Sequence, residues 1–115
     1  GTWYPGDKKA LRAMLTRFFD KVRIPAKANG RLIALISPHA GYPYSGPTAA
    51  YGYKLLKKHG KDIRLVVVMG PSHHVPFKGL ALPDWDGFKT PLGTVPVACD
   101  LVKKLAKQAP FRVFD

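Results

Sequence analysis

The spacing of apolar residues near the start of the chain predicts an amphipathic helix. After Asp7, a residue type that favours helix N-caps, apolar side chains recur at intervals of three and four residues. They fall on one helical face and are Leu11, Met14, Leu15, Phe18, Phe19 and Val22. We expect this helix to end before the turn-prone stretch IPAKANG, residues 24–30.

Two short and almost wholly apolar runs follow, and each predicts a strand that is buried on both faces. They are residues 31–37 (RLIALIS) and residues 63–69 (IRLVVVM). Between them, Pro47 suits the first turn of a helix and Gly60 suits its end. Because strand–helix–strand units have parallel strands in nearly all proteins, the pattern predicts an α/β fold with a mainly parallel sheet and flanking helices.

The rest of the chain predicts smaller elements. Residues 78–97 are rich in Gly and Pro, which favours short extended pieces joined by turns. Asp100 is placed to cap a last helix over residues 101–109. At 115 residues, the chain is expected to form one domain at most.

Composition limits the class of protein. A hydrophobic content of 46% with 11% aromatic residues is typical of a globular chain. No apolar run approaches the roughly 20 residues of a membrane span, and the N-terminus lacks a signal-peptide pattern. One cysteine, Cys99, excludes an internal disulfide, and we expect it to be a small buried apolar side chain. The prediction is a cytoplasmic protein without membrane contact.

The formal net charge of +12 raises the question of nucleic-acid binding. However, the basic residues are spread through the N-terminal, middle and C-terminal parts of the chain, where they fit the solvent faces of amphipathic helices. The chain contains no groove-reading motif. We therefore expect no specific nucleic-acid site.

One histidine follows each of the two predicted strands. His39 comes after residues 31–37 through Ser37 and Pro38, and His73 comes after residues 63–69 through a Gly-Pro-Ser turn. In open α/β sheets, ligands bind outside the carboxyl ends of the strands. Neighbouring strands lie about 4.8 Å apart, so both imidazoles could reach one metal ion. The alternative is that each histidine is an ordinary hydrogen-bonded turn residue.

Two histidines do not complete a metal site. Non-haem iron requires a carboxylate beside two histidines, and catalytic zinc requires three protein ligands. The chain contains no Glu, and Asp84 and Asp86 are more simply interpreted as turn residues. His74, next to His73, is expected to point elsewhere and is a candidate for acid–base chemistry.

Four motifs in order along the chain resemble the Memo family, whose prokaryotic members are called AmmeMemoRadiSam system protein B. The motifs are GTWYPGD (residues 1–7), SPHAGYPYSG (37–46), MGPSHHVPF (69–77) and KTPLGTVPV (89–97). The resemblance implies a fold like the catalytic subunits of class III extradiol dioxygenases. It also implies that His39 and His73 bind a copper or iron ion together with a cysteine far downstream. Family members are over twice as long, so the expectation is the N-terminal part of one Memo-like domain over residues 1–115, an incomplete fold and a third ligand beyond residue 115.

Two functions are compatible with this resemblance. In a redox or dioxygenase-like protein, His74 would shuttle protons, and Tyr42 or Tyr44 would line the pocket. In a binding module without catalysis, the same crevice would hold a peptide, a small molecule or a phospho-ligand against Trp3, Tyr4 and the same tyrosines. The family name further implies AMMECR-like and radical SAM proteins as partners.

Overall fold

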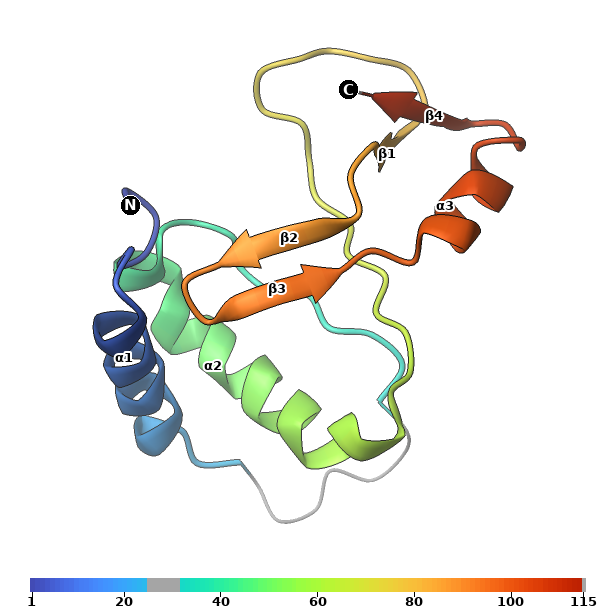
Figure 1. Cartoon of the computed structure of the whole chain (residues 1–115). Coiled ribbons are helices and arrows are strands. Elements are labelled where there is room, and N and C mark those ends of the chain that lie inside the picture. Colours follow the sequence, from blue (N-terminus) through green and yellow to red (C-terminus); the bar gives the residue numbers. More distant parts are fainter. Residues whose placement is uncertain (25–31, 115) are drawn as a thin grey trace. The chain divides into compact units, whose positions relative to one another are not determined.

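The computed structural model describes residues 1–24 and 32–114 as a mixed α/β chain (Figure 1). Its contacts divide the chain into two compact units, Gly1–Val67 and Val68–Asp115, which are described separately below. The first contains helices α1 (Lys8–Lys21) and α2 (Tyr42–His59) and the short 3-10 helix η1 (Gly60–Asp62). The second contains β1 (Leu80–Pro83), β2 (Gly87–Thr90), β3 (Gly93–Pro96), α3 (Cys99–Leu105) and β4 (Phe111–Phe114).

Helix α1 forms where the apolar spacing predicts it. The Asp7 side chain caps its N-terminus, with Oδ1 accepting a hydrogen bond from the Ala10 amide at 2.7 Å. The same apolar face supplies the small core of the first unit, in which Leu11 and Val22 are only 3% and 2% exposed. Ala50 of α2 is buried as well, at 4% exposure. The helical face that is apolar in the sequence is therefore the face that supplies buried side chains in the structure.

Close packing joins α1 to α2, which lie side by side in Figure 1. Gly46 of α2 is buried, and a methyl group added there would overlap the ring of Phe18 from α1. The absence of a side chain at Gly46 therefore lets the aromatic ring pack directly on the helix backbone. This contact fixes the distance between the two helices.

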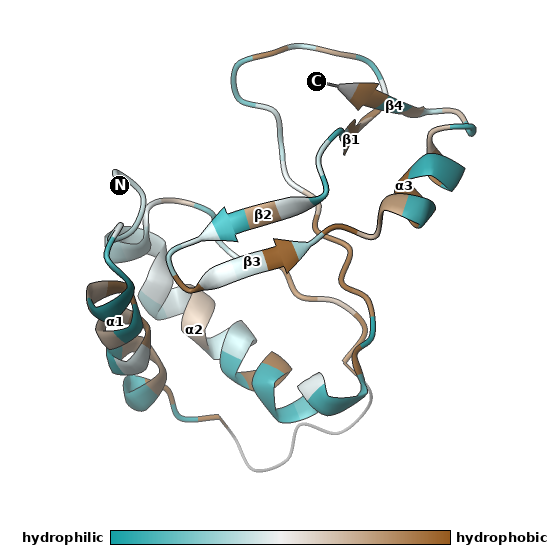
Figure 2. Ribbon diagram, in the orientation of Figure 1, coloured by the Kyte–Doolittle hydropathy of each residue, from teal (hydrophilic) through white to brown (hydrophobic). Residues whose placement is uncertain are grey.

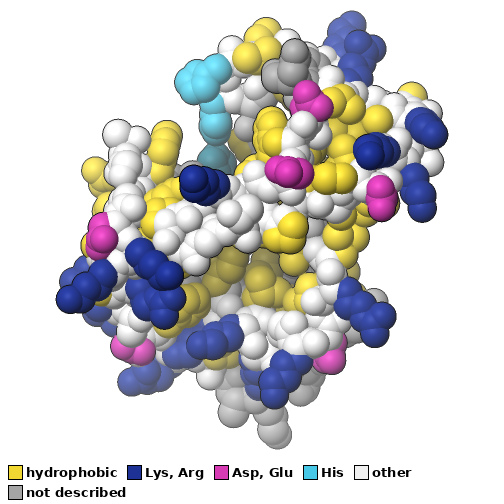
Figure 3. Space-filling view, viewed as in Figure 1, with side chains coloured by type: hydrophobic (Ala, Val, Ile, Leu, Met, Phe, Trp, Pro, Cys, Tyr) yellow, Lys and Arg dark blue, Asp and Glu magenta, His cyan; other side chains and the backbone are white. Residues whose placement is uncertain are grey.

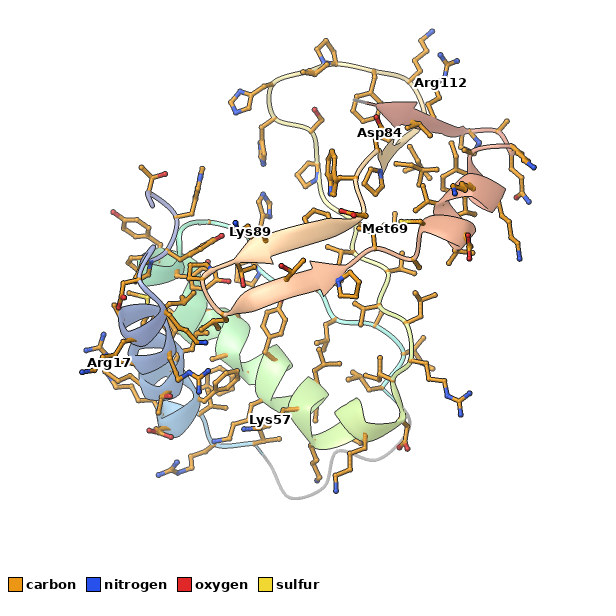
Figure 4. The ribbon with its side chains drawn as sticks, viewed as in Figure 1. Arg17, Lys57, Met69, Asp84, Lys89 and Arg112 are labelled. Atoms are coloured by element: carbon orange, nitrogen blue, oxygen red, sulfur yellow. The ribbon has the colours of Figure 1, made fainter. Side chains whose placement is uncertain are left out.

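A lysine from α2 stabilises the C-terminal end of α1. The Lys54 ammonium donates hydrogen bonds to the carbonyl oxygens of Phe19 at 2.7 Å and Val22 at 3.0 Å. These carbonyls belong to the last turn and cap of the helix, where orphan acceptors and the negative end of the helix dipole favour a cation. Arg17, by contrast, points away from α2 into solvent (Figure 4).

The second unit contains two small sheets within the described residues. β1 pairs in parallel with β4, from Leu80 opposite Phe111 to Pro83 opposite Phe114. β2 and β3 form an antiparallel hairpin. Gly79, before β1, has φ +97°, and a side chain there would overlap the Pro110 carbonyl, which also accepts a hydrogen bond from the Leu80 amide.

The two apolar runs predicted as strands are not strands in the structure. Residues 32–37 and 63–69 form no ladder, and Arg31 lies outside the described residues. Ile36 is fully exposed and Val68 is 86% exposed, although both lie in apolar sequence, as Figure 2 shows for residues 63–69. A strand requires a hydrogen-bonded neighbour, and no described residue provides one here. The parallel pairing in this chain comes instead from β1 and β4.

The predicted helix boundaries also need correction. α2 begins at Tyr42, so Pro47 lies inside the helix rather than in its first turn. The Gly41 carbonyl accepts from the amides of Tyr44 and Ser45, and this closes the first turn ahead of the proline. Gly60 ends the helix as predicted.

The last predicted helix is shorter than residues 101–109. α3 ends at Leu105, and Ala98 rather than Asp100 occupies its N-cap. Asp100 lies within the first turn, where its negative charge still interacts favourably with the helix dipole.

The extended pieces predicted within residues 78–97 are confirmed as β1, β2 and β3. None of the described helices combines the length and apolar character needed to cross a membrane.

Replacing Gly46 by Ala should destabilise the protein, because the new methyl group overlaps the Phe18 ring. Overpacking of this kind costs about 1 to 3 kcal/mol of unfolding free energy. Gly52→Ala, in the same helix, is the matched control, because its methyl would meet Leu35 at an ordinary 3.6 Å. That control should be neutral or stabilising by up to about 1 kcal/mol. Urea unfolding of the two variants measures the difference, and equal stabilities would contradict the packing argument.

Replacing Lys54 by Met should lower the unfolding free energy by about 1 to 2 kcal/mol, because the side chain keeps its apolar stem but loses both hydrogen bonds to α1. Lys57→Met, at an exposed position of the same helix (Figure 4), is the control and should change stability little. Thermal unfolding compares the two variants. A loss no larger for Lys54 than for Lys57 would show that the Lys54 bonds contribute nothing.

Candidate metal-ligand residues

His39 lies on the turn that leads into α2. It is exposed and precedes the first helical residue, Tyr42, by three positions. In the preceding segment, residues 32–37, Leu35 lies within van der Waals reach of the Gly52 position of α2.

Two hydrogen bonds from outside the turn hold it in place. The Ser45 hydroxyl, 7% exposed, donates to the Ala40 carbonyl at 2.7 Å. The Tyr42 amide donates to the Trp3 carbonyl at 2.8 Å. The N-terminal motif (residues 1–7) and the histidine motif (residues 37–46), which are 30 positions apart in sequence at their nearest residues, are thus in direct contact.

An aromatic pair covers the start of α2. The Tyr4 and Tyr42 rings lie 5.2 Å apart between centroids and are inclined by 42°. Burial raises the pKa of Tyr42 above its ordinary value, and the nearby Tyr53 and Tyr4 phenols raise that pKa further. Tyr44, the other predicted pocket tyrosine, is 85% exposed.

His73 and His74 lie on an exposed turn in the second unit. Ser72 closes this turn, since its hydroxyl donates to the Val75 carbonyl at 2.7 Å and accepts from the Val75 amide at 3.4 Å. The two imidazole rings are 6.4 Å apart between centroids, and their planes are inclined by 58°. The neighbouring rings therefore differ in orientation.

The described residues provide the two predicted ligands in separate units, His39 in the first and His73 in the second. Their sharing of one ion stays a prediction. Neutral imidazoles suit copper, iron and zinc, so the donor chemistry fits either predicted metal. Across residues 1–24 and 32–114, no group of three or more His, Cys, Asp or Glu side chains could hold a metal ion.

The other candidate ligands have structural roles. Cys99 is half-buried at the start of α3, with Sγ 3.5 Å from the Val97 carbonyl oxygen. Asp84 and Asp86 lie in the turn between β1 and β2, where the Asp86 carbonyl accepts from the Val97 amide at 2.8 Å. These positions agree with the interpretation of both aspartates as turn residues.

Sequence reasoning missed Ser45. Its side chain is the buried polar group next to the His39 turn, but serine in a helix is common and its partner is a backbone carbonyl. The available signal was its place three residues after Tyr42 in the motif SPHAGYPYSG. That spacing lets a side chain in the first helical turn reach back to the residues before the helix.

The raised pKa of Tyr42 predicts a loss of stability at alkaline pH. The folded protein holds the phenol proton more tightly than the unfolded chain, so its contribution is fully present below about pH 10 and is lost as pH rises through the folded pKa. Tyr42→Phe should flatten this alkaline slope, whereas Tyr51→Phe, at a 55% exposed position, should not. Unfolding free energies between pH 8 and pH 11 provide the measurement, and identical slopes for wild type and Tyr42→Phe would refute the assignment.

Comparison with known proteins shows that the chain is similar to one protein family over its whole length. The protein-family model described as Memo-like protein matches residues 1–115. A MEMO1 family protein of Nitrosopumilus maritimus (strain SCM1) is 36% identical over 118 residues, covering 100% of this chain and 42% of the relative. Protein memo-1 homolog of Caenorhabditis elegans is 35% identical over 115 residues, covering 100% and 31%. Protein MEMO1 of Homo sapiens is 39% identical over 92 residues, covering 80% and 29%. The chain thus spans less than half the length of these relatives.

Proposed function

Because this chain belongs to the family of Memo-like proteins, we propose that it is part of a metal-binding protein in which His39 and His73 are ligands of one copper or iron ion. The observation that supports this most is the match over residues 1–115, which includes both histidine motifs. Each of the two histidines lies on an exposed turn that a serine hydroxyl braces through a backbone carbonyl. Such turns present imidazoles on a fixed backbone, as metal binding requires.

The chemistry assigned to the chain's own residues is binding and proton transfer. His39 and His73 would act as neutral nitrogen donors, and a third ligand would come from beyond residue 115. The ion would supply redox activity toward oxygen species, in the manner of a dioxygenase-like protein. His74, one residue from a ligand, would hold or release a proton, while Tyr42 and Tyr44 would border the site.

A binding function without redox chemistry is the second candidate. It is favoured by the exposure of two aromatic side chains in the unit that contains His39, Tyr44 at 85% and Trp3 at 64%. Exposed aromatic side chains offer contact area for a peptide or phospho-ligand. Metal content separates the two functions, because only the redox function requires a stoichiometric redox metal.

We extend the proposal to partners and location. The protein would act in the cytoplasm within a three-part system with AMMECR-like and radical SAM proteins, and it would not read nucleic-acid sequence. The charge distribution supports the last point. On the face drawn in Figure 3, Lys and Arg side chains lie in several groups, and Asp side chains and uncharged surface lie among these groups.

Replacing either His39 or His73 by Ala in the full-length protein should remove most copper or iron binding, because each substitution deletes a direct ligand. Replacing His74 by Ala should cost less, about 10 to 100-fold in affinity or activity, since it acts beside the ligands. His59→Ala, at the C-terminal end of α2, is the control and should keep wild-type metal content. Metal stoichiometry by elemental analysis after equilibration with each ion is the measurement.

The outcomes of this experiment separate the hypotheses. Loss of metal in both the His39 and His73 variants supports a shared site. Wild-type metal content in the His39 variant would refute the shared site. Absence of stoichiometric metal from the wild-type protein after loading would favour the binding function instead.

A further inference from the structure

The turn that bears His39 is held by hydrogen bonds to α2 on one side and to the N-terminal segment on the other. The helix has Gly41 as its N-cap, with no side-chain hydrogen bond at that position. The bracing comes instead from Ser45 on one side and from the Trp3 carbonyl on the other. The backbone between His39 and Tyr42 is thereby fixed independently of any cap residue.

Ser45 makes the side-chain contact of these two. Its hydroxyl is 2.7 Å from the Ala40 carbonyl oxygen and 3.4 Å from the Gly41 carbonyl oxygen, in a side chain that is 7% exposed. The Ala40 carbonyl belongs to the residue directly after His39. Fixing this carbonyl fixes the plane of the peptide bond between Ala40 and Gly41, one residue after His39.

The N-terminal segment closes the other side of the turn. The Trp3 carbonyl accepts from the Tyr42 amide at 2.8 Å, and Gly41 is buried beneath the same residue. A methyl group at Gly41 would meet the Trp3 carbonyl oxygen at 3.5 Å, so the two backbones already lie in near contact. Tyr4 then packs its ring on Tyr42.

From this geometry we propose that Ser45 is a positioning residue that holds the His39 turn in the conformation needed for metal binding. The effect on metal binding rests on the proposed function. The bracing of the turn by Ser45 does not, because it is a feature of the structure itself. Loss of the hydroxyl removes the hydrogen bond from Ser45 to the Ala40 carbonyl. The turn then samples other conformations, and His39 loses the preorganisation that makes binding tight.

The metal arm of the test uses the full-length protein and Ser45→Ala. We expect copper or iron affinity to fall about 10 to 100-fold in a competition titration, the size typical of residues that orient a ligand. Leu11→Ala is the stability control, because it truncates a buried side chain that takes no part in the Ser45 hydrogen bonds and should destabilise without changing the affinity of the folded protein. If Leu11→Ala does not fold, Lys54→Met serves the same purpose.

A metal-free arm tests the braced turn directly. Amide hydrogen exchange by nuclear magnetic resonance should be faster at Tyr42 in Ser45→Ala than in wild type. The His39 imidazole signals should shift, while those of His59, at the other end of α2, should stay unchanged. Thr16→Ala, at an exposed position of α1, is the matched hydroxyl deletion and should alter neither signal.

These two arms distinguish the failure of each proposal. If wild type binds metal and Ser45→Ala binds it equally well, the role of Ser45 is overturned while the metal site stands. If wild type binds no metal, the proposed function fails, and the exchange data still decide the turn. Unchanged exchange at Tyr42 and an unchanged His39 signal would overturn the positioning role in either case.

Discussion

The first unit depends on the close approach of α1 and α2 at Gly46. Because this position has no side chain, the Phe18 ring packs on the helix backbone, and the helices come near enough for Lys54 to reach the last carbonyls of α1. The same approach buries Leu11, Val22 and Ala50, whose removal from water provides the main stabilisation available to so small a core. The packing of the two helices also fixes the start of α2, and the turn that bears His39 leads directly into that start.

Elements whose causes are local could be predicted from the sequence, and elements with distant causes could not. α1 follows from its Asp7 cap and its apolar spacing, both contained within one segment. The sequence predicts Pro47 in the first turn of the second helix, but α2 begins five residues earlier, at Tyr42, because the Gly41 carbonyl closes the first turn ahead of the proline. The cap of α3 was missed for a similar reason, since the Ala98 backbone rather than the Asp100 side chain begins the helix.

The two predicted strands show most clearly what an apolar sequence pattern cannot predict. Apolar runs such as residues 32–37 and 63–69 indicate that a segment is suited to burial in a sheet, but a ladder exists only where another segment supplies donors and acceptors. β1 illustrates the converse: it was predicted as an extended piece, while its partner β4, about 30 residues later, was not predicted at all. Pairing is a non-local property, and this chain spans at most 42% of the length of the relatives compared above.

In the candidate site, too, some residues could be predicted from the sequence, whereas the groups that hold them in place could not. His39 and His73 could be named as candidate ligands from the sequence, because each follows an apolar run and lies in a specific motif. Ser45 could not, because its contribution is one hydrogen bond to a backbone carbonyl within a turn. A histidine that binds a metal ion must be held in a productive direction to bind well, and the turn that bears His39 is held by Ser45 and by the Trp3 carbonyl of the N-terminal segment. The groups that hold this turn are therefore a buried hydroxyl and a main-chain carbonyl, which only the fold brings to the turn.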